Sequence, residues 1–290
     1  MSLEKIKLIF FILYKHSMSF NLQNKKVLIT GGADGLGKSL IDELIKKNCT
    51  VTCVDKDEIK LNNINHKNIK KILCDLRNLN ETEHLLKKIE GEKYDILINN
   101  AGYEIGSLLK EVPMKDFIDN YNCNFFSHVM LTKAFVSSLS SRDGNTKIIN
   151  MVSDTAFRAI PTRASYCSSK ASFRNFIEAM RVELKIYNID CITVTPPKLD
   201  TNFFKKIQYF GYLNKEKLPY SDSRPFYPTN KFAKQIIAGI ENNKKYIWVF
   251  SITKIFLFIN YLLPFIGDFM VEKLSTWKTI KEKLKNDNKI

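Results

Sequence analysis

The sequence predicts an α/β protein in which a parallel sheet is covered by helices on both faces. Short apolar runs alternate with stretches of helical spacing, which is typical of repeated strand–helix units. Polar residues directly follow several of the apolar runs, and parallel strands all end at one edge of their sheet. A glycine-rich turn joins the first predicted strand to the first predicted helix. These observations together favour a doubly wound sheet with a ligand site at that edge.

The first strand–helix unit resembles a dinucleotide-binding turn. Residues 27–29 form a short apolar run, and residues 38–47 carry apolar side chains at helical spacing. Between them lies T-G-G-A-D-G-L-G, residues 30–37, whose glycines let a pyrophosphate approach the backbone. The following helix offers free N–H groups and the positive end of its dipole to the same phosphates.

A carboxylate follows the second predicted strand, residues 51–54, where it can select the cofactor. Asp55 lies about 20 positions after the glycines, and an acidic residue there can bond both ribose hydroxyls of NAD. The same charge would repel the 2′-phosphate of NADP. Lys56 is the counter-argument, because a cation beside Asp55 could hold that phosphate. We therefore expect NAD in preference to NADP.

Two further strands are predicted at residues 71–74 and 95–98, and both end in polar residues. Asp75 follows the first of them, and Asn99-Asn100-Ala101-Gly102 follows the second. We expect these residues to lie with Asp55 and Ser153 at the ligand-binding edge of the sheet.

Tyr166 and Lys170 are four residues apart, so a helix would direct both side chains to one face. A phenol ionises near pH ~10, and a neighbouring ammonium group lowers that pKa. The pair could then donate or accept a proton, and the Ser153 hydroxyl could hold a substrate oxygen. Taken alone, the spacing also arises by chance on surface helices.

In order and spacing, these motifs resemble the short-chain dehydrogenase/reductase family over roughly residues 25–205. The matching pieces are T-G-G-A-D-G-L-G, C-D-L at 74–76, N-N-A-G at 99–102, Asn124 within N-C-N-F-F-S, Ser153, and Y-C-S-S-K at 166–170. The resemblance implies a Rossmann-type doubly wound parallel sheet with helices on both faces, plus a C-terminal helical extension. It also implies NAD(P)-dependent interconversion of a secondary alcohol and a ketone or aldehyde.

The resemblance implies a role for each matching residue. Asn124, in a helix of residues 115–139, would help hold a proton-relaying water, and Ser153 would bond the substrate oxygen. Tyr166 would exchange the proton, while Lys170 lowers its pKa and grips the nicotinamide ribose. The residues implied at the cofactor are Gly31, Asp34, Gly35, Leu36, Gly37, Asp55, Asp75, Leu76, Asn100, Ala101, Gly102, Tyr166, Lys170 and Thr201.

The sequence departs from the family after the strand predicted at residues 191–195. The family usually has Pro-Gly there, whereas this chain has Pro196-Pro197. Proline fixes φ and has no N–H, so the wall beside the nicotinamide differs from the usual one. This departure keeps open the alternative of a non-catalytic dinucleotide-binding sensor or scaffold.

Residues 203–227 are rich in aromatic side chains and correspond to the segment that covers the substrate in the family. An aromatic lid favours a bulky apolar substrate such as a lipid, sterol or retinoid. A lid that merely packs on its own domain would explain the same composition.

The two ends of the chain carry apolar segments outside the catalytic domain expected at residues 25–250. The N-terminal segment, 1–24, contains an apolar run at residues 8–14 that is too short to span a bilayer. This run predicts a short helix that lies on the domain or on a membrane surface. In the extension, 251–290, residues 251–266 are nearly all apolar and a Lys-rich tail follows. We expect peripheral membrane contact there, with a homodimer or homo-oligomer surface as the alternative.

Composition excludes several other classes of function. The net charge of +15 comes mostly from Lys spread along all 290 residues, which does not indicate a nucleic-acid site. The six Cys include no C-x-x-C pair, which favours reduced thiols and a cytoplasmic location. The four His have no metal-ligand spacing, so we expect no metal.

Overall fold

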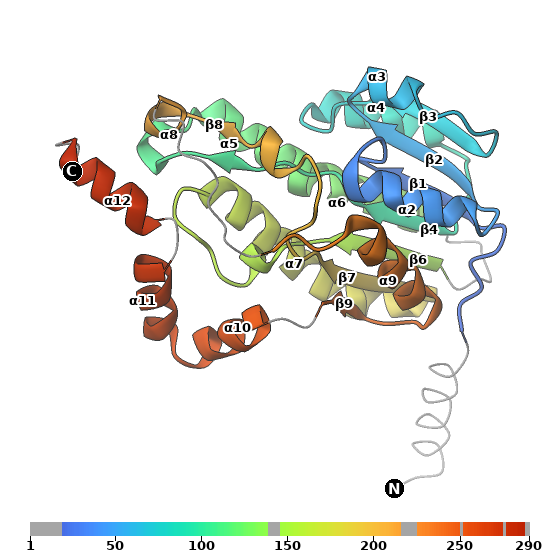
Figure 1. Ribbon diagram of the computed structural model, residues 1–290. Helices are drawn as coiled ribbons and strands as arrows, with labels where there is room; N and C mark the ends of the chain where they lie inside the picture. Colours follow the sequence, from blue (N-terminus) through green and yellow to red (C-terminus); the bar gives the residue numbers. More distant parts are fainter. Residues whose placement is uncertain (1–18, 139–145, 216–224, 250–251, 275–276, 288–290) are drawn as a thin grey trace, which may run out of the picture.

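A computed structural model describes residues 19–138, 146–215, 225–249, 252–274 and 277–287. Within these residues the chain forms a central sheet flanked by helices, with an arm of three helices at the C-terminal end (Figure 1). The apolar run predicted to be helical at residues 8–14 lies outside the described residues.

The central sheet contains seven strands, all parallel, in the order β3-β2-β1-β4-β6-β7-β9. The predicted fold class is therefore confirmed. The predicted strands are all present, and their ends differ from the prediction by only one or two residues. The strands are β1 (Lys26–Thr30), β2 (Thr50–Asp55), β3 (Ile69–Leu73), β4 (Ile96–Asn99), β6 (Thr146–Met151), β7 (Ile189–Thr195) and β9 (Tyr246–Trp248).

Alternation along the central strands builds one apolar core on each face of the sheet. In β1, Val27 and Ile29 contribute to one core, whereas Leu28 contributes to the other. Helices α2 (Gly35–Ile45) and α9 (Thr229–Glu241) cover the first face. Helices α4 (Leu79–Ile89), α6 (Ser127–Ser138) and α7 (Ala164–Glu183) cover the second. Burial on both faces explains why the strands are almost continuously apolar.

The helix predicted at residues 115–139 is not one continuous α-helix. It consists of α5 (Met114–Tyr121), a π-helical turn at Asn122–Phe126, and α6. Single π-turns occur frequently at functional sites because they reorient the side chains that they carry. Asn124 lies in the middle of this turn.

The lid extends from the carboxyl end of β7 and pairs with the loop that follows β4. Strands β5 (Ile105–Gly106) and β8 (Gln208–Tyr209) form a small parallel sheet, and α8 (Gly211–Lys215) follows. Residues 216–224 of the predicted lid, including Tyr220, lie outside the described residues.

The arm contains α10 (Ile252–Leu262), α11 (Pro264–Leu274) and α12 (Trp277–Asn286). It runs along one side of the molecule, and α12 approaches the lid helix α8 (Figure 1). Ile280 and Leu284 pack with Tyr212 and Leu213, so the arm is attached to the lid. Among the described helices, none is both long and apolar enough to cross a membrane.

Candidate active site

A cavity of about 390 Å³ opens at the carboxyl ends of β1, β2, β4, β6 and β7. Between β1 and β4 the strand order reverses direction, which is the usual ligand crevice of doubly wound sheets. All predicted site residues except Asn124 line the cavity: Gly31, Asp34, Gly35, Leu36, Gly37, Asp55, Asp75, Leu76, Asn100, Ala101, Gly102, Ser153, Tyr166, Lys170 and Thr201.

The glycine turn forms one wall of the cavity and needs its glycines for two reasons. Gly31 and Gly35 have φ angles of +64° and +52°, a region that favours glycine. A side chain on Gly31 would also lie 2.9 Å from the Ala101 Cα atom. Asp34 caps α2 by accepting a hydrogen bond from the Gly35 N–H at 2.8 Å. This cap explains why α2 starts at Gly35, three residues before the predicted start.

Asn100 acts on the protein backbone of this turn. Its Nδ2 atom donates to the carbonyl oxygens of Thr30 and Gly31, each at 2.9 Å. The Thr30 hydroxyl in turn accepts bonds from the N–H groups of Asn100 and Ala101, at 3.1 and 3.0 Å. These bonds hold the ends of β1 and β4 together, so Asn100 shapes the groove as well as lining it.

The two predicted carboxylates already have protein partners. Asp55 accepts from the Ala33 N–H at 2.9 Å, which fixes it against the glycine turn. Asp75 is held by Arg77, whose Nε atom donates at 2.9 Å. Partial burial alone would raise the pKa of Asp75, but Arg77 lowers it below its ordinary value. Both carboxylates line the cavity at the ends of their strands.

Helix α7 carries Tyr166 and Lys170 on the face that meets the cavity, as their spacing predicts. Lys170 is 3% exposed, and its Nζ atom donates to the Met151 carbonyl at 3.0 Å. Burial lowers the pKa of Lys170 to about 8. Its ammonium group therefore titrates far more easily than that of a surface lysine.

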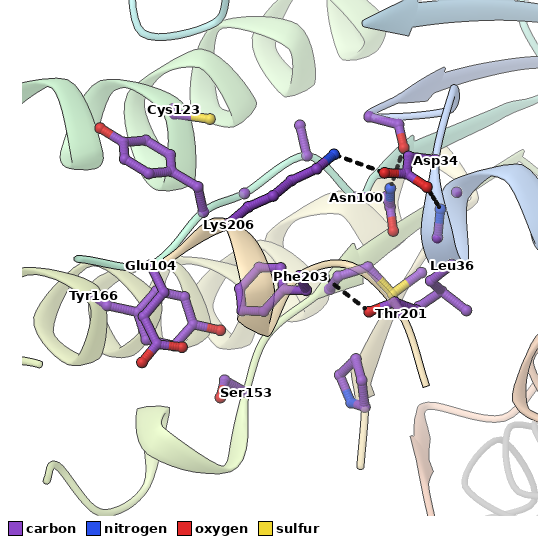
Figure 2. A pocket seen from close by; sticks show the side chains of 18 of the residues that line it. Asp34, Leu36, Asn100, Glu104, Cys123, Ser153, Tyr166, Thr201, Phe203 and Lys206 are labelled. Atoms are coloured by element: carbon purple, nitrogen blue, oxygen red, sulfur yellow. Dashed lines mark hydrogen bonds and ion pairs between the residues drawn. The ribbon is translucent and has the colours of Figure 1, made fainter. Parts of the chain in front are cut away.

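Ser153 follows β6 and reaches the same cavity (Figure 2). Its hydroxyl oxygen accepts bonds from the Thr155 N–H and hydroxyl groups, at 3.2 and 2.9 Å. Because Ser153 is the acceptor in both bonds, its own hydrogen can be donated to a substrate oxygen.

Asn124 is completely buried behind the cavity, next to Lys170. A side chain at Gly102 would meet both the Asn124 Oδ1 atom, at 3.0 Å, and the Lys170 Nζ atom, at 3.1 Å. The Asn124 amide exchanges two bonds with the Tyr103 backbone and donates to Ser169 at 3.1 Å. It thus joins the loop after β4 to the face of α7 that lines the cavity.

Several contacts on the lid side of the cavity were not predicted from the sequence. The Phe203 ring lies 6.1 Å from the Tyr166 ring, and Lys206 forms a 2.7 Å ion pair with Asp34 across the cavity (Figure 2). Glu104 and Arg163, both buried, form an ion pair beside the small β5–β8 sheet. Pairs so distant in sequence leave no local pattern, and Lys206 does not stand out among the many lysines of this chain.

Comparison with known proteins identifies the family. A family model for short chain dehydrogenases matches residues 25–209. The 3-ketodihydrosphingosine reductase of Dictyostelium discoideum is 28% identical over 261 residues, covering 81% of this chain and 78% of that protein. The 3-oxoacyl-(acyl-carrier-protein) reductase of Buchnera aphidicola is 30% identical over 203 residues, covering 67% and 82%.

A solved structure has the same fold. The short chain dehydrogenase from Burkholderia cenocepacia, crystallised with NADP, matches with a TM-score of 0.71 at 19% identity, covering 88% of this chain and 100% of that one. The family match spans more than half of the chain and runs from β1 to β8, the region that forms most of the cavity. The chain therefore belongs to the short-chain dehydrogenase family and is an oxidoreductase.

Proposed function

We propose that this protein is an NAD(P)H-dependent reductase of a 3-keto group on a long acyl chain. The observation that carries the proposal is the meeting of Ser153, Tyr166 and Lys170 with the glycine turn in one cavity. The nicotinamide cofactor, when bound, supplies the hydride for such a reduction. The protein supplies orientation and the proton.

In this proposal Ser153 and Tyr166 hold the substrate carbonyl oxygen between them. Tyr166 donates its phenolic proton to that oxygen as the carbonyl carbon is reduced. The Lys170 ammonium, next to the phenol, stabilises the phenolate that remains. Asn124 is held by the Tyr103 backbone and Ser169 close to Lys170 and would hold the water that returns the proton.

The groove along the glycine turn fits a dinucleotide. The amino end of α2 and the φ-positive glycines leave room for a diphosphate close to the backbone. Asp55 faces the region of the adenosine ribose, which supports NAD over NADP. Asp75, Leu76, Ala101, Gly102 and Thr201 would line the rest of the cofactor.

The apolar lid supports an acyl chain as the substrate body. Phe203 and Phe204 line the cavity next to Tyr166, and their rings pack edge to face at 5.5 Å. The two relatives named above are reductases of a 3-keto or 3-oxo compound. These names favour a 3-keto acyl or long-chain-base substrate over a sterol or retinoid.

A substrate panel tests the proposal. Purified protein is assayed with NADH and with NADPH against 3-keto long-chain bases, 3-ketoacyl thioesters and sterol ketones. We expect turnover with one of the first two classes and none with sterol ketones. Tight dinucleotide binding without turnover of any ketone would favour the sensor or scaffold instead. A sensor would also keep its cellular function in Ser153→Ala and Lys170→Ala but lose it in Gly35→Asp.

We also propose that the arm contacts a cytoplasmic membrane surface peripherally. Phe258, Tyr261, Phe265 and Phe269 of α10 and α11 are 60–81% exposed. Exposed Lys278, Lys283 and Lys285 lie on α12. Apolar side chains next to lysines favour an anionic lipid surface. A homodimer that buries the same face is the competing arrangement.

Vesicle flotation separates these two arrangements. The wild type should float with anionic vesicles and be partly released by high salt. Phe258→Ser with Phe265→Ser should abolish flotation, whereas Ile186→Ser, an exposed apolar residue outside the arm, should not. A wild-type dimer that ignores vesicles and becomes monomeric in the double variant would identify a subunit interface.

A further inference from the structure

One short segment of the lid touches both ends of the cavity. Thr201 packs against the glycine turn, since a side chain at Gly35 would lie 3.3 Å from its Cγ2 atom. Two residues later, Phe203 lies against the Tyr166 ring. Lys206 then reaches back to Asp34, whose Oδ2 atom is 2.7 Å from the lysine Nζ atom (Figure 2).

Asp34 is an unusual neighbour for a bound diphosphate. Its carboxylate sits at the amino end of α2, where the phosphates of a dinucleotide would bind, and like charges repel there. Partial burial would raise the pKa of Asp34, but the ion pairs with Lys206 and Lys60 lower it to about 2. The carboxylate is therefore charged at every physiological pH.

Lys206 and Lys60 together offset this charge. Both lysine Nζ atoms lie 2.7 Å from the same Asp34 oxygen, and Lys60 also pairs with Asp57 at 3.3 Å. Without Lys206, Lys60 alone would face the carboxylates of Asp34 and Asp57, which leaves one net negative charge at the phosphate site. Lys60 can remain with Asp34 when Lys206 moves, because Lys60 is fixed on the neighbouring helix α3 (Glu58–Asn62). Lys206 is half exposed and lines the cavity, so it is free to turn towards a phosphate.

We propose that Lys206 is a cofactor-binding residue that contacts the dinucleotide diphosphate and thereby couples cofactor binding to holding the lid segment 201–206 closed over the cavity. This rests on the proposed dinucleotide-dependent function. The Lys206 ammonium pairs with Asp34 in the structure and would be shared between Asp34 and a phosphate oxygen of the bound dinucleotide. Phe203 of the same segment lies against Tyr166, so a phosphate contact of Lys206 would also hold the substrate side closed.

NADH affinities of four proteins test the contact: the wild type, Lys206→Gln, Asp34→Asn and the double variant. Lys206→Gln should weaken binding about tenfold, as for a lost charge-assisted hydrogen bond. Asp34→Asn keeps a capping oxygen and removes the repelling charge, so it should tighten binding. The decisive comparison is between Asp34→Asn and the double variant. If Lys206 contacts the diphosphate, the double variant binds NADH more weakly than Asp34→Asn. If Lys206 only neutralises Asp34, the double variant and Asp34→Asn bind NADH equally well, and the proposal is wrong.

Lys205→Gln is the matched control, because Lys205 is an exposed lysine in the same turn and does not line the cavity. It should bind NADH like the wild type. Hydrogen exchange of residues 201–208 reports closure: NADH should slow it in the wild type and in Lys205→Gln but not in Lys206→Gln. Equal slowing in all three would overturn the coupling. Failure of the wild type to bind either dinucleotide would instead overturn the proposed function itself.

Discussion

Helices α9 and α10 lie close together in the sequence and both carry large apolar side chains, yet the surroundings of those side chains are opposite. In α9 the side chains of Phe232, Ile236 and Ile240 are completely buried against the sheet. In α10, Leu257 is the one buried side chain among those the structure describes, whereas Phe258 is 64% exposed. The apolar side chains of α9 are covered by the sheet, whereas most of those described in α10 are not covered by any described residue.

The difference lies in the arrangement of the apolar residues. In α9 they recur every three or four positions, which gives one apolar stripe for one core. In α10 they occupy nearly every position, so no single contact with the domain can bury them all. A helix that is apolar on all sides needs surroundings that are apolar on several sides. The arm therefore forms helices but exposes apolar side chains that the described part of the domain does not cover.

The largest expected effect is on stability, from a matched pair of phenylalanines. Phe232→Ala in α9 should lower the free energy of unfolding by about 3–5 kcal/mol, because it leaves a cavity in a closed core. Phe258→Ala in α10 should change it by less than about 0.5 kcal/mol, as for other exposed positions. Urea unfolding of both variants at two protein concentrations measures the contrast. A concentration-dependent loss in Phe258→Ala would mean that a second copy covers α10.

The next largest effect is on turnover, and it contrasts the cavity with the arm. Tyr166→Phe removes the proposed proton donor and should lower kcat by roughly 10² or more, with NADH affinity unchanged. Tyr187→Phe, at an exposed tyrosine, is the control for the loss of a hydroxyl group. With a water-soluble ketone, Phe258→Ala should retain wild-type kcat. Near-normal turnover by Tyr166→Phe would show that another group supplies the proton.

A third prediction uses a titratable residue of the closed core. His128 of α6 is completely buried, 3.4 Å from the Thr30 hydroxyl and 5.0 Å from the Phe173 ring centre. Burial, helped by the Lys170 charge, lowers the pKa of His128 to about 3. Between pH 3 and its ordinary value of about 6.5, the unfolded chain binds more protons than the folded one. The free energy of unfolding should thus fall by about 2 kcal/mol from pH 7 to pH 5 through His128.

Urea unfolding of the wild type and His128→Gln at pH 7 and pH 5 checks this pH dependence. The variant should lose less stability on acidification, whatever its stability at pH 7. His84→Gln, at an exposed position of α4, should behave like the wild type. Equal acid sensitivity in His128→Gln and the wild type would assign the pH dependence to other groups.

The sequence predicted the sheet and the cavity well because both depend on short-range patterns. Apolar runs, glycines with positive φ and the four-residue spacing of Tyr166 and Lys170 each follow from local geometry. The π-turn around Asn124 was not predicted, because it depends on bonds to Tyr103 and Ser169 from other elements. The Lys206–Asp34 pair joins residues 172 positions apart and has no local signal either. The π-turn and this ion pair both depend on contacts between distant parts of the chain, and such contacts form only when the chain folds.

The smallest expected effect concerns cofactor choice, and it tests a residue whose surroundings were predicted only in part. Asp55 was expected to face the ribose, but it also accepts the Ala33 N–H bond. Asp55→Asn keeps an oxygen for that bond and removes the charge, so the glycine turn should stay intact. NADPH affinity should rise several-fold relative to NADH, as expected for the loss of about 1 kcal/mol of repulsion near the surface.

Calorimetric titration of each variant with NADH and NADPH gives the affinity ratio. Asp57→Asn is a graded control, because Asp57 also lines the cavity and Asn preserves its cap on α3. It should shift the ratio less than Asp55→Asn, since its charge already pairs with Lys60. If the wild type binds NADPH more tightly than NADH, Lys56 or Arg77 sets the preference, and Asp55 serves mainly to hold the glycine turn. Phe258→Ala in the arm should leave the ratio unchanged, because none of the arm residues that the structure describes lines the cavity.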